Sequence, residues 1–241
     1  MNNPLPQGAT IGILGGGQLG RMLSVAASRL GLNTHIFEPG ANPPAGQVAQ
    51  WVTMASYDDG EALRSFAQSV DVITYEFENI PMSALDIIED ICPIHPGRQA
   101  LAVSQDRLSE KEFLTGLGLK VAPYADVTNA EQADVAVARI GAPSILKTRR
   151  MGYDGKGQMR LKQASDMPAA WQAMAGSASV LEGFIDFSHE VSVIAARASD
   201  GQLACFDPGE NVHRDGILHT TTVPANLTTS QRMDAVLIAA K

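Results

Sequence analysis

Four glycines, at positions 15, 16, 17 and 20, separate an apolar run from an amphipathic segment near the start of the chain. Thr10 to Leu14 has the apolar, β-branched composition of a buried strand, and the apolar residues between Arg21 and Leu30 recur at helical spacing. A second strand-like run, Asn33 to Phe37, follows directly. Strand, glycine turn, helix and strand within about 30 residues form a right-handed βαβ unit. The beginning of the chain therefore predicts a parallel sheet.

The same alternation continues to about residue 100. We expect strands over residues 49–53 and 70–75 and helices over residues 58–69 and 82–91. Because strands that alternate with helices pair in parallel and are covered on both faces, this part of the chain predicts a doubly wound α/β domain.

The pattern then changes. Residues 104–117 predict an amphipathic helix with Ser104 as its N-cap, and its buried face would consist of Leu108, Phe113, Leu114 and Leu117. Further strands are expected over residues 121–127, 144–147, 158–161, 179–184, 190–196 and 203–206, and further helices over residues 130–140, 166–174 and 230–241. This half predicts an α+β domain built on antiparallel sheet, and we assign residues 1–103 and 104–241 to the two domains.

Composition and charge narrow the class of protein. Of the 241 residues 45% are apolar, and 18 Lys and Arg against 26 Asp and Glu give a net charge of −8, so a broad surface for nucleic acid or an anionic membrane is not expected. The longest apolar runs are strand-sized and the N-terminus has no targeting pattern, which favours a cytoplasmic protein. Cys92 and Cys205 lie far apart in apolar stretches, so we expect reduced core thiols.

The glycine turn has several interpretations. Gly15-x-Gly17-x-x-Gly20 matches the dinucleotide-binding fingerprint, and Glu38 stands where a ribose-binding acid would, which taken alone predicts an NAD-dependent dehydrogenase. Glycines before a helix also let the backbone approach any anion, so a phosphorylated metabolite is equally compatible, and a purely structural turn remains open.

A second glycine-rich stretch, Lys147 to Gln158, follows an apolar strand. Its three glycines let the backbone curl with amide groups pointing inward, and its four cations, Lys147, Arg149, Arg150 and Lys156, add positive charge. Such a loop fits a polyphosphate, and the alternative is an ordinary charged turn.

Downstream of this loop three further motifs occur in order: Glu182-Gly-Phe-Ile185, Glu190, and Glu210-Asn-Val-His213. In this order they resemble the ATP-grasp superfamily, in which a nucleotide lies between two α+β subdomains. Within it the chain resembles the family of 5-(carboxyamino)imidazole ribonucleotide synthases, the ATPase subunit of phosphoribosylaminoimidazole carboxylase. The resemblance also rests on residues 15–22, 74–81, 105–111 and 152–158 and covers essentially the whole chain. It implies a Rossmann-like pre-ATP-grasp domain followed by an ATP-grasp domain that is incomplete at its C-terminus.

The resemblance also implies roles for individual residues. Those that would bind ATP are Arg107, Lys147, Gly152, Tyr153, Asp154, Gly155, Lys156, Gly157, Gln158, Glu182, Gly183, Phe184, Ile185, Glu190 and His213. The residues that would hold aminoimidazole ribonucleotide are Gln18, Leu19 and Glu76, and the catalytic residues of the loop would be Tyr153, Asp154 and Lys156. The Mg²⁺ ligands of the family lie beyond the point where this chain stops, so we expect no metal ligand here and little turnover from a chain that looks truncated.

The implied reaction is an ATP-dependent ligation in purine biosynthesis. Bicarbonate attacks the γ-phosphate of ATP to give carboxyphosphate, and the amine of the ribonucleotide captures the carboxyl group, with ADP and phosphate as by-products. A homodimer is expected from the resemblance. The alternatives are another ATP-grasp ligase, such as the formate-dependent glycinamide ribonucleotide transformylase, the NAD-dependent dehydrogenase, and a binding module without catalysis.

Overall fold

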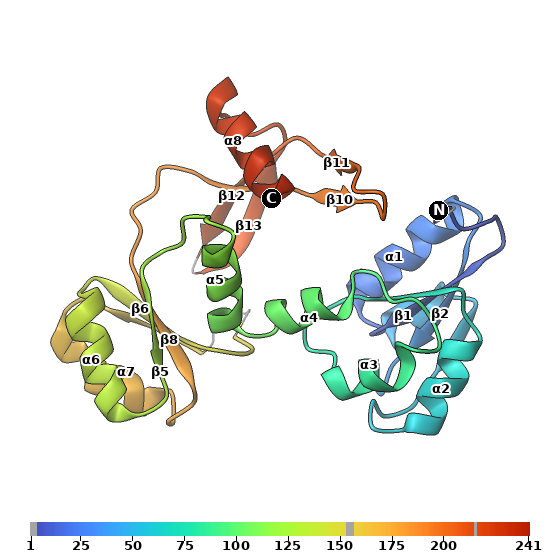
Figure 1. Cartoon of the computed structure of the whole chain (residues 1–241), viewed down its shortest axis with the longest axis horizontal. Helices are drawn as coiled ribbons and strands as arrows, with labels where there is room; N and C mark the ends of the chain where they lie inside the picture. The colour runs from blue at the N-terminus through green and yellow to red at the C-terminus, as the bar shows by residue number, and fades with distance from the viewer. Residues whose placement is uncertain (1–3, 153–156, 215) are drawn as a thin grey trace. The chain divides into compact units, whose positions relative to one another are not determined.

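A computed structural model of the chain describes residues 4–152, 157–214 and 216–241 (Figure 1). The chain divides into two compact units, an N-terminal unit that extends to Gln105 and a C-terminal unit that begins at Asp106. Each unit has its own sheet and its own core.

The N-terminal unit is built on a four-stranded parallel sheet of order β3-β2-β1-β4. The strands are β1 (Thr10–Leu14), β2 (Asn33–Phe37), β3 (Trp51–Thr53) and β4 (Val72–Tyr75). The helices are α1 (Gln18–Arg29), α2 (Gly60–Gln68), α3 (Met82–Ile88) and α4 (Arg98–Ser104), with a 3₁₀ turn, η1 (Pro44–Gln47). Strands alternate with helices along the chain, which confirms the predicted α/β class.

Adjacent residues of each central strand enter different cores, because side chains alternate across a strand. Ile13 and Ile36 pack with Ala45 of η1 on one face of the sheet. Leu14 and Phe37, the next residue of each strand, belong to the larger core that α2 and α3 contribute to on the other face. The sheet is therefore buried on both sides, as expected for parallel strands.

The C-terminal unit begins with α5 (Arg107–Gly116) and a second four-stranded sheet, in which all neighbours are antiparallel. Its order is β5-β8-β6-β7, from β5 (Tyr124–Val127), β6 (Ser144–Thr148), β7 (Gln158–Leu161) and β8 (Ser179–Gly183). One face is covered by α6 (Ala130–Ile140) and α7 (Met167–Ala173), which follows the short η2 (Ala164–Asp166). Figure 1 shows these two helices on one side of the sheet and α5 on the other.

The remainder of the C-terminal unit is a smaller set of strands and one helix. A three-stranded antiparallel sheet has the order β13-β12-β9, from β9 (Glu190–Ser192), β12 (Gly209–Arg214) and β13 (Ile217–Thr222). A separate pair is formed by β10 (Ala195–Arg197) and β11 (Leu203–Cys205), and α8 (Thr229–Ala240) follows. Antiparallel sheets with helices confirm the predicted α+β class.

The helix expected over residues 104–117 was wrong in its start and in its buried face. Ser104 ends α4, and α5 begins only after Asp106, whose carboxylate accepts hydrogen bonds from the amides of Leu108 and Ser109 (3.0 and 3.1 Å). No residue of α5 is fully buried. Phe113, for example, is 43% exposed. An aspartate at the N-cap outweighed the apolar periodicity on which the expectation rested.

Other differences concern the end of the chain. The strand expected over residues 190–196 is two strands, β9 and β10, which pair with different partners. The β12–β13 hairpin was missed because its second strand is exposed along its whole length and shows no alternation of polar and apolar residues. Cys92 is buried as expected, whereas Cys205 is only half-buried, and both are free thiols.

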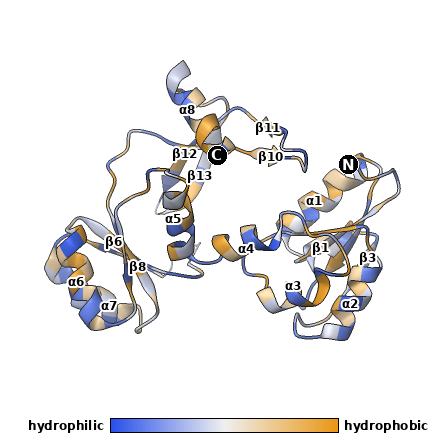
Figure 2. Ribbon diagram, viewed as in Figure 1, coloured by the Kyte–Doolittle hydropathy of each residue, from blue (hydrophilic) through white to orange (hydrophobic). Residues whose placement is uncertain are grey.

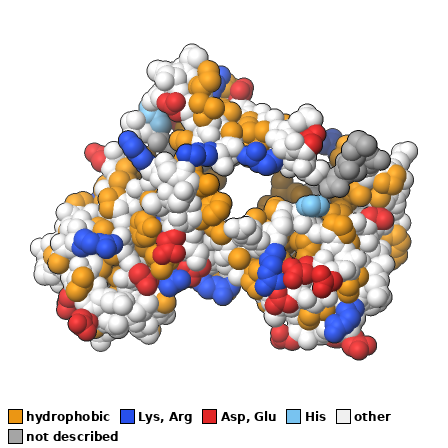
Figure 3. Space-filling view, in the orientation of Figure 1, with side chains coloured by type: hydrophobic (Ala, Val, Ile, Leu, Met, Phe, Trp, Pro, Cys, Tyr) orange, Lys and Arg blue, Asp and Glu red, His pale blue; other side chains and the backbone are white. Residues whose placement is uncertain are grey.

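The surface carries side chains of both charge signs, as expected from 18 Lys and Arg and 26 Asp and Glu. In Figure 3 acidic and basic side chains occur on both units among apolar ones. Figure 2 shows apolar residues on α8, and of these Met233, Leu237 and Ile238 are exposed. No helix in the described ranges is long and apolar enough to cross a membrane.

The stability of the N-terminal unit should depend on pH through His35. Its ring nitrogens bond the hydroxyl oxygens of Ser69 and Thr53 (both 2.9 Å), and burial lowers the pKa of His35 in the folded chain. The unfolded chain therefore takes up the proton first, and stability falls as the pH drops below about 6.5, the ordinary pKa of histidine.

This prediction is tested by urea unfolding between pH 5 and 8. A Trp171→Phe background leaves Trp51, in the N-terminal unit, as the single tryptophan reporter. We expect His35→Gln to lose stability less steeply below pH 6.5 than the parent. The control His95→Gln changes an exposed histidine of the same unit and should follow the parent curve. Parallel curves for His35→Gln and the parent would contradict the prediction.

Candidate functional site

Two carboxylates hold the glycine turn of the N-terminal unit. Glu76, directly after β4, accepts hydrogen bonds from the amides of Gly17 and Gly20, one at each oxygen. Glu38, directly after β2, accepts from the amides of Gly16 (2.8 Å) and Gly40 (2.9 Å). The carboxyl ends of parallel strands meet at one edge of a sheet, so both acids reach the N-terminus of α1, where its free amides favour negative charge.

The glycines of the turn are required by this close approach. Gly15 has φ +101°, and a Cβ there would lie 2.5 Å from Cγ of Glu76. A Cβ at Gly20 would lie 2.9 Å from the carbonyl oxygen of Gly15. Any larger side chain would push Glu76 away from the amides.

Gln18 and Leu19, the two residues between Gly17 and Gly20, are exposed. Their backbone N–H groups make no hydrogen bond to the part of the chain that the structure describes. Glu38, like Glu76, accepts backbone amides at both carboxylate oxygens, so the acid that suggested a dinucleotide site also holds the backbone of the turn.

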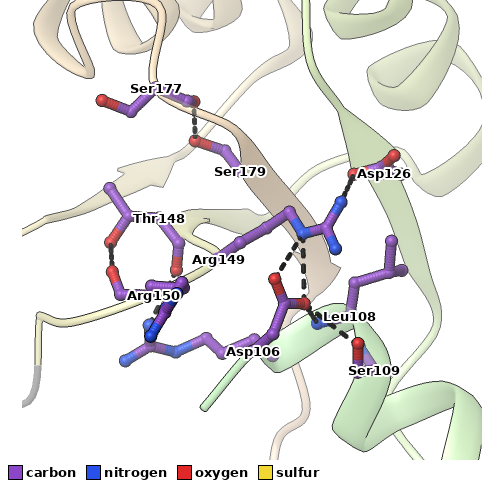
Figure 4. A network of polar contacts seen from close by, with 10 residues as sticks. Asp106, Leu108, Ser109, Asp126, Thr148, Arg149, Arg150, Ser177 and Ser179 are labelled. Atoms are coloured by element: carbon purple, nitrogen blue, oxygen red, sulfur yellow. Dashed lines mark hydrogen bonds and ion pairs between the residues drawn. The ribbon is translucent and has the colours of Figure 1, made fainter. Parts of the chain in front are cut away.

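In the C-terminal unit, Arg149 ties the start of the glycine loop to the start of α5 (Figure 4). Its Nε lies 2.9 Å from Asp106 Oδ2, and its Nη1 lies 3.6 Å from Asp126 Oδ1 on β5. Burial alone would raise the pKa of Asp106, but the hydrogen bond and charge of Arg149 and the amides of Ser109 and Leu108 together lower it. Asp106 is therefore ionised. It caps α5 and, through Arg149, holds the end of the glycine loop that follows β6.

Arg107, which the resemblance places at the ATP phosphates, contacts the backbone of the glycine loop in this structure. Its guanidinium donates to the carbonyl oxygens of Thr148 (2.7 Å) and Met151 (2.6 Å), and its amide donates to the carbonyl of Arg149 (2.8 Å). The loop re-enters β7 through Gly157, whose φ is +68° and whose carbonyl accepts from the amide of Thr148 (2.9 Å).

The expected loop residues Tyr153, Asp154, Gly155 and Lys156 lie outside the described residues. Of their neighbours, Gly152 has φ +76° and Gln158 begins β7, where it pairs with Lys147 across the sheet. The structure thus defines both ends of the glycine loop.

Lys147 and Glu182, which the sequence left as separate candidates, form an ion pair. Lys147 Nζ lies 2.9 Å from Glu182 Oε2, and Lys111 Nζ of α5 lies 3.1 Å from Glu182 Oε1. Burial alone would raise the pKa of Glu182, but Lys147 and then Lys111 lower it below its ordinary value. The pair lies on the sheet face opposite α6 and α7, because Leu146 and Leu181, the adjacent residues, point into that core.

The strand that ends with Glu182 continues as an exposed connection. The amides of Gly183 and Phe184 donate to the carbonyls of Pro123 (2.8 Å) and Pro143 (3.1 Å). The amide of Ile185 has no partner among the residues described, and its side chain is exposed. One free backbone donor at this point suits a heterocycle with an acceptor nitrogen.

A second polar group lies on β9 and β12. His213 Nδ1 is 3.4 Å from Glu190 Oε1, and the Asn211 side-chain amide donates to the same oxygen (3.5 Å). The structure brings Glu190 and His213 together, as the resemblance implied for two residues near one nucleotide. Within the described ranges no group of three or more His, Cys, Asp or Glu side chains could hold a metal ion.

Sequence reasoning missed Asp106, Asp126 and Lys111 as parts of the site. Asp106 and Lys111 fall inside the motif at residues 105–111 that carried the resemblance, so their position was a usable signal. Asp126 had no signal, since its pairing with Arg149 depends on how β5 and β6 lie in the sheet.

Comparison with known proteins agrees with this division of the chain. The model of the ATP-grasp domain matches residues 112–241, and that of the ribonucleotide synthetase preATP-grasp domain matches residues 8–105. The chain belongs to the ATP-grasp family.

Named relatives make the similarity more specific. The chain is 49% identical over 239 residues to an N5-carboxyaminoimidazole ribonucleotide synthase of Brucella melitensis, a match that covers 98% of this chain and 66% of that protein. It is similar to the solved ADP complex of such a synthetase (TM-score 0.94, 40% identity, 99% of this chain and 63% of that one). It is also similar to the enzyme of Aspergillus clavatus in complex with ADP and 5-aminoimidazole ribonucleotide (TM-score 0.87, 26% identity, 97% and 62%). The chain thus spans slightly less than two thirds of these relatives.

Loss of the Glu76 carboxylate should destabilise the N-terminal unit. Glu76→Ala leaves two amides of the turn without their acceptor, and we expect a loss of about 1–3 kcal/mol in the free energy of unfolding. Glu76→Gln keeps one acceptor oxygen and should lose less. Trp51 fluorescence in the Trp171→Phe background measures both. The control is Glu78→Ala, because Glu78 accepts only from its neighbour Asn79 among the described residues; an equal loss in the control would refute the assignment.

Asp106 offers a test that separates capping from ion pairing. Asp106→Asn can still cap α5 but loses the charge that pairs with Arg149, whereas Asp106→Ala loses both. We expect Asp106→Ala to destabilise the C-terminal unit by about 1–2 kcal/mol and Asp106→Asn by less. A Trp51→Phe background makes Trp171 the reporter of this unit. Equal stability of the alanine variant and the parent would show that the cap is dispensable.

Proposed function

We propose that this chain carries the nucleotide-binding and ribonucleotide-binding parts of an ATP-dependent ligase that carboxylates 5-aminoimidazole ribonucleotide with bicarbonate. The product would be N5-carboxyaminoimidazole ribonucleotide, formed with ADP and phosphate in purine biosynthesis. The observation that carries the proposal is the ion pair Lys147–Glu182, on the sheet face opposite α6 and α7 and beside a glycine loop, in a chain similar to proteins solved with ADP.

ATP would bind to the C-terminal unit. Lys147 supplies an ammonium group for the phosphates, and Gly152 and Gly157 allow the loop between them to bend over the nucleotide. The backbone from Glu182 to Ile185 offers a carbonyl and a free amide for adenine, and Glu190, beside His213, can accept from the ribose hydroxyls. Arg107 would contact the phosphates while it holds the start of the loop, and Tyr153, Asp154 and Lys156 are proposed to face the reacting groups.

The ribonucleotide would bind to the N-terminal unit at the glycine turn. The free amides of Gln18 and Leu19 at the start of α1 can donate to its phosphate, and Glu76, fixed beside them, offers carboxylate oxygens to its hydroxyl or amino groups. The likeness to a synthase solved with ADP and this ribonucleotide supports the choice of substrate.

Catalysis would consist of positioning and charge neutralisation, with no covalent enzyme intermediate. Bicarbonate attacks the γ-phosphate and releases ADP, the ribonucleotide amine then attacks the carboxyl carbon of carboxyphosphate, and phosphate leaves. The protein must exclude water while carboxyphosphate exists, which is the task that a closing loop performs. Mg²⁺ would neutralise phosphate charge, but the described residues hold no cluster fit to bind it alone, so no step here runs through the metal. We also propose that the protein is a homodimer and that it acts in the cytoplasm.

The proposal is tested by titration with 5-aminoimidazole ribonucleotide, glycinamide ribonucleotide, an ATP analogue and NADH. We expect binding of the first and the ATP analogue. Phosphate release with bicarbonate and, in parallel, with formate, measured on a form of the protein as long as its relatives, then reports which acid is used. Tight binding of NADH, or a preference for glycinamide ribonucleotide with formate, would replace the proposed function by the dehydrogenase or the transformylase.

Lys147→Met should weaken binding of the ATP analogue and of ADP by about tenfold or more, because a charge-assisted contact to phosphate is lost. Binding of 5-aminoimidazole ribonucleotide should be unchanged, since Lys147 belongs to the other unit. Calorimetric titration measures both ligands on one preparation. Lys162→Met, at an exposed lysine of the same unit, is the control. Unchanged nucleotide affinity in Lys147→Met would remove Lys147 from the site.

A further inference from the structure

Glu182 stands between two lysines that come from different elements. Lys147 approaches it from β6 at 2.9 Å and Lys111 from α5 at 3.1 Å, each at a different carboxylate oxygen. The side chains of Glu182 and Lys111 are 12% and 14% exposed, and that of Lys147 is 26% exposed. Two ammonium groups therefore contact one carboxylate among partly buried side chains. The three side chains together carry a net charge of about +1.

The two lysines differ in how they are held. Lys111 is the more enclosed, and its ammonium lies 5.8 Å from the centroid of the Tyr124 ring, which stands opposite Glu182 on β5. Lys147 is the more exposed and lies beside the start of the glycine loop. The charged and titratable groups that face Glu182 are thus Lys147 from β6, Lys111 from α5 and Tyr124 from β5. Of the two ammonium groups, Lys147 is the one free to turn outward.

We propose that Lys111 is a positioning residue, which keeps the Glu182 carboxylate ionised and fixed when Lys147 turns from it to the phosphates of the nucleotide. The inference rests on the proposed nucleotide function, since it assigns a role to a residue that does not itself touch the ligand. Glu182 begins the backbone stretch proposed to hold adenine, so a fixed side chain at this point keeps that stretch in register with β5 and β6.

The charges explain why a second lysine is needed. Burial disfavours the ionised form of Glu182, and its pKa is low because Lys147 and Lys111 both oppose that effect. If Lys147 leaves and Lys111 is absent, the carboxylate has no cation beside it and must take up a proton or pull Lys147 back. Either outcome weakens nucleotide binding. The weakening becomes smaller as the pH falls, because protonation of Glu182 then costs less free energy.

The test compares ADP binding by Lys111→Met, Lys111→Arg and the control Lys120→Met between pH 5.5 and 8.5. Lys120 is exposed and makes no ion pair with any described residue. Titration calorimetry in two buffers of different ionisation enthalpy gives the affinity and the number of protons taken up. Thermal unfolding of each variant without ligand records the structural effect separately.

We expect Lys111→Met to bind ADP about tenfold more weakly at pH 8, as for the loss of one charge-assisted hydrogen bond, and to take up a proton on binding. The deficit should shrink as the pH falls, because protonated Glu182 needs no cation. Lys111→Arg should restore affinity, and Lys120→Met should match the parent. In a Glu182→Gln background, Lys111→Met should cause no further loss.

Three results would overturn the inference. One is a loss of affinity in Lys111→Met that is the same at every pH without proton uptake, since this is what a merely structural tie between α5 and β8 would give. Another is unchanged affinity. A third is a further loss from Lys111→Met when Glu182 is already glutamine. Failure of the parent chain to bind ADP at any pH would instead overturn the nucleotide function itself, and this inference with it.

Discussion

A carboxylate that leaves bulk water must be matched by donors or cations, and this constraint shapes every candidate site of the chain. Glu76 and Glu38 are matched by backbone amides of the glycine turn, Asp106 by two amides and Arg149, and Glu182 by two lysines. Each acid stands at the end of a strand or at the beginning of a helix. The same bonds therefore fix the local backbone and set the charge of the site.

The two units use this constraint in different ways. In the N-terminal unit the acids are neutralised by peptide dipoles, so the negative charge stays close to a helix start and leaves the adjacent amides of Gln18 and Leu19 as donors. In the C-terminal unit the acids Asp106 and Glu182 are paired with side-chain cations, Arg149 and the two lysines. Backbone amides are fixed in position, so the arrangement in the N-terminal unit suits a ligand that must be held in one orientation. Lysine and arginine side chains carry full positive charge, so the arrangement in the C-terminal unit suits a ligand with several negative charges, such as a polyphosphate.

The fold was largely predictable from local pattern, and the reasons are specific. β1 was found with its observed bounds because it is a short apolar run next to a glycine turn, and β2 because it follows the helix directly. α6 was found because its apolar residues repeat at helical spacing. α4 was not expected, and α5 was expected to begin at Ser104, which is the last residue of α4. The sign of the true start of α5 is its N-cap, Asp106. β13 was missed because an exposed strand has no apolar face to reveal it.

The sequence offered candidate site residues singly, and the structure shows which of them lie together. Lys147, Glu182, Glu190 and His213 were each expected near a nucleotide, yet nothing in the sequence joins Lys147 to Glu182, which are 35 residues apart. That contact exists because β6 and β8 are neighbours in an antiparallel sheet, and register, which places Ile145 opposite Glu182 and so Lys147 within reach, is a property of the folded sheet. Arg107 shows a second contact that the sequence did not reveal: its guanidinium donates to the carbonyls of Thr148 and Met151. These bonds fix the start of the glycine loop, because they join it to the first residue of α5.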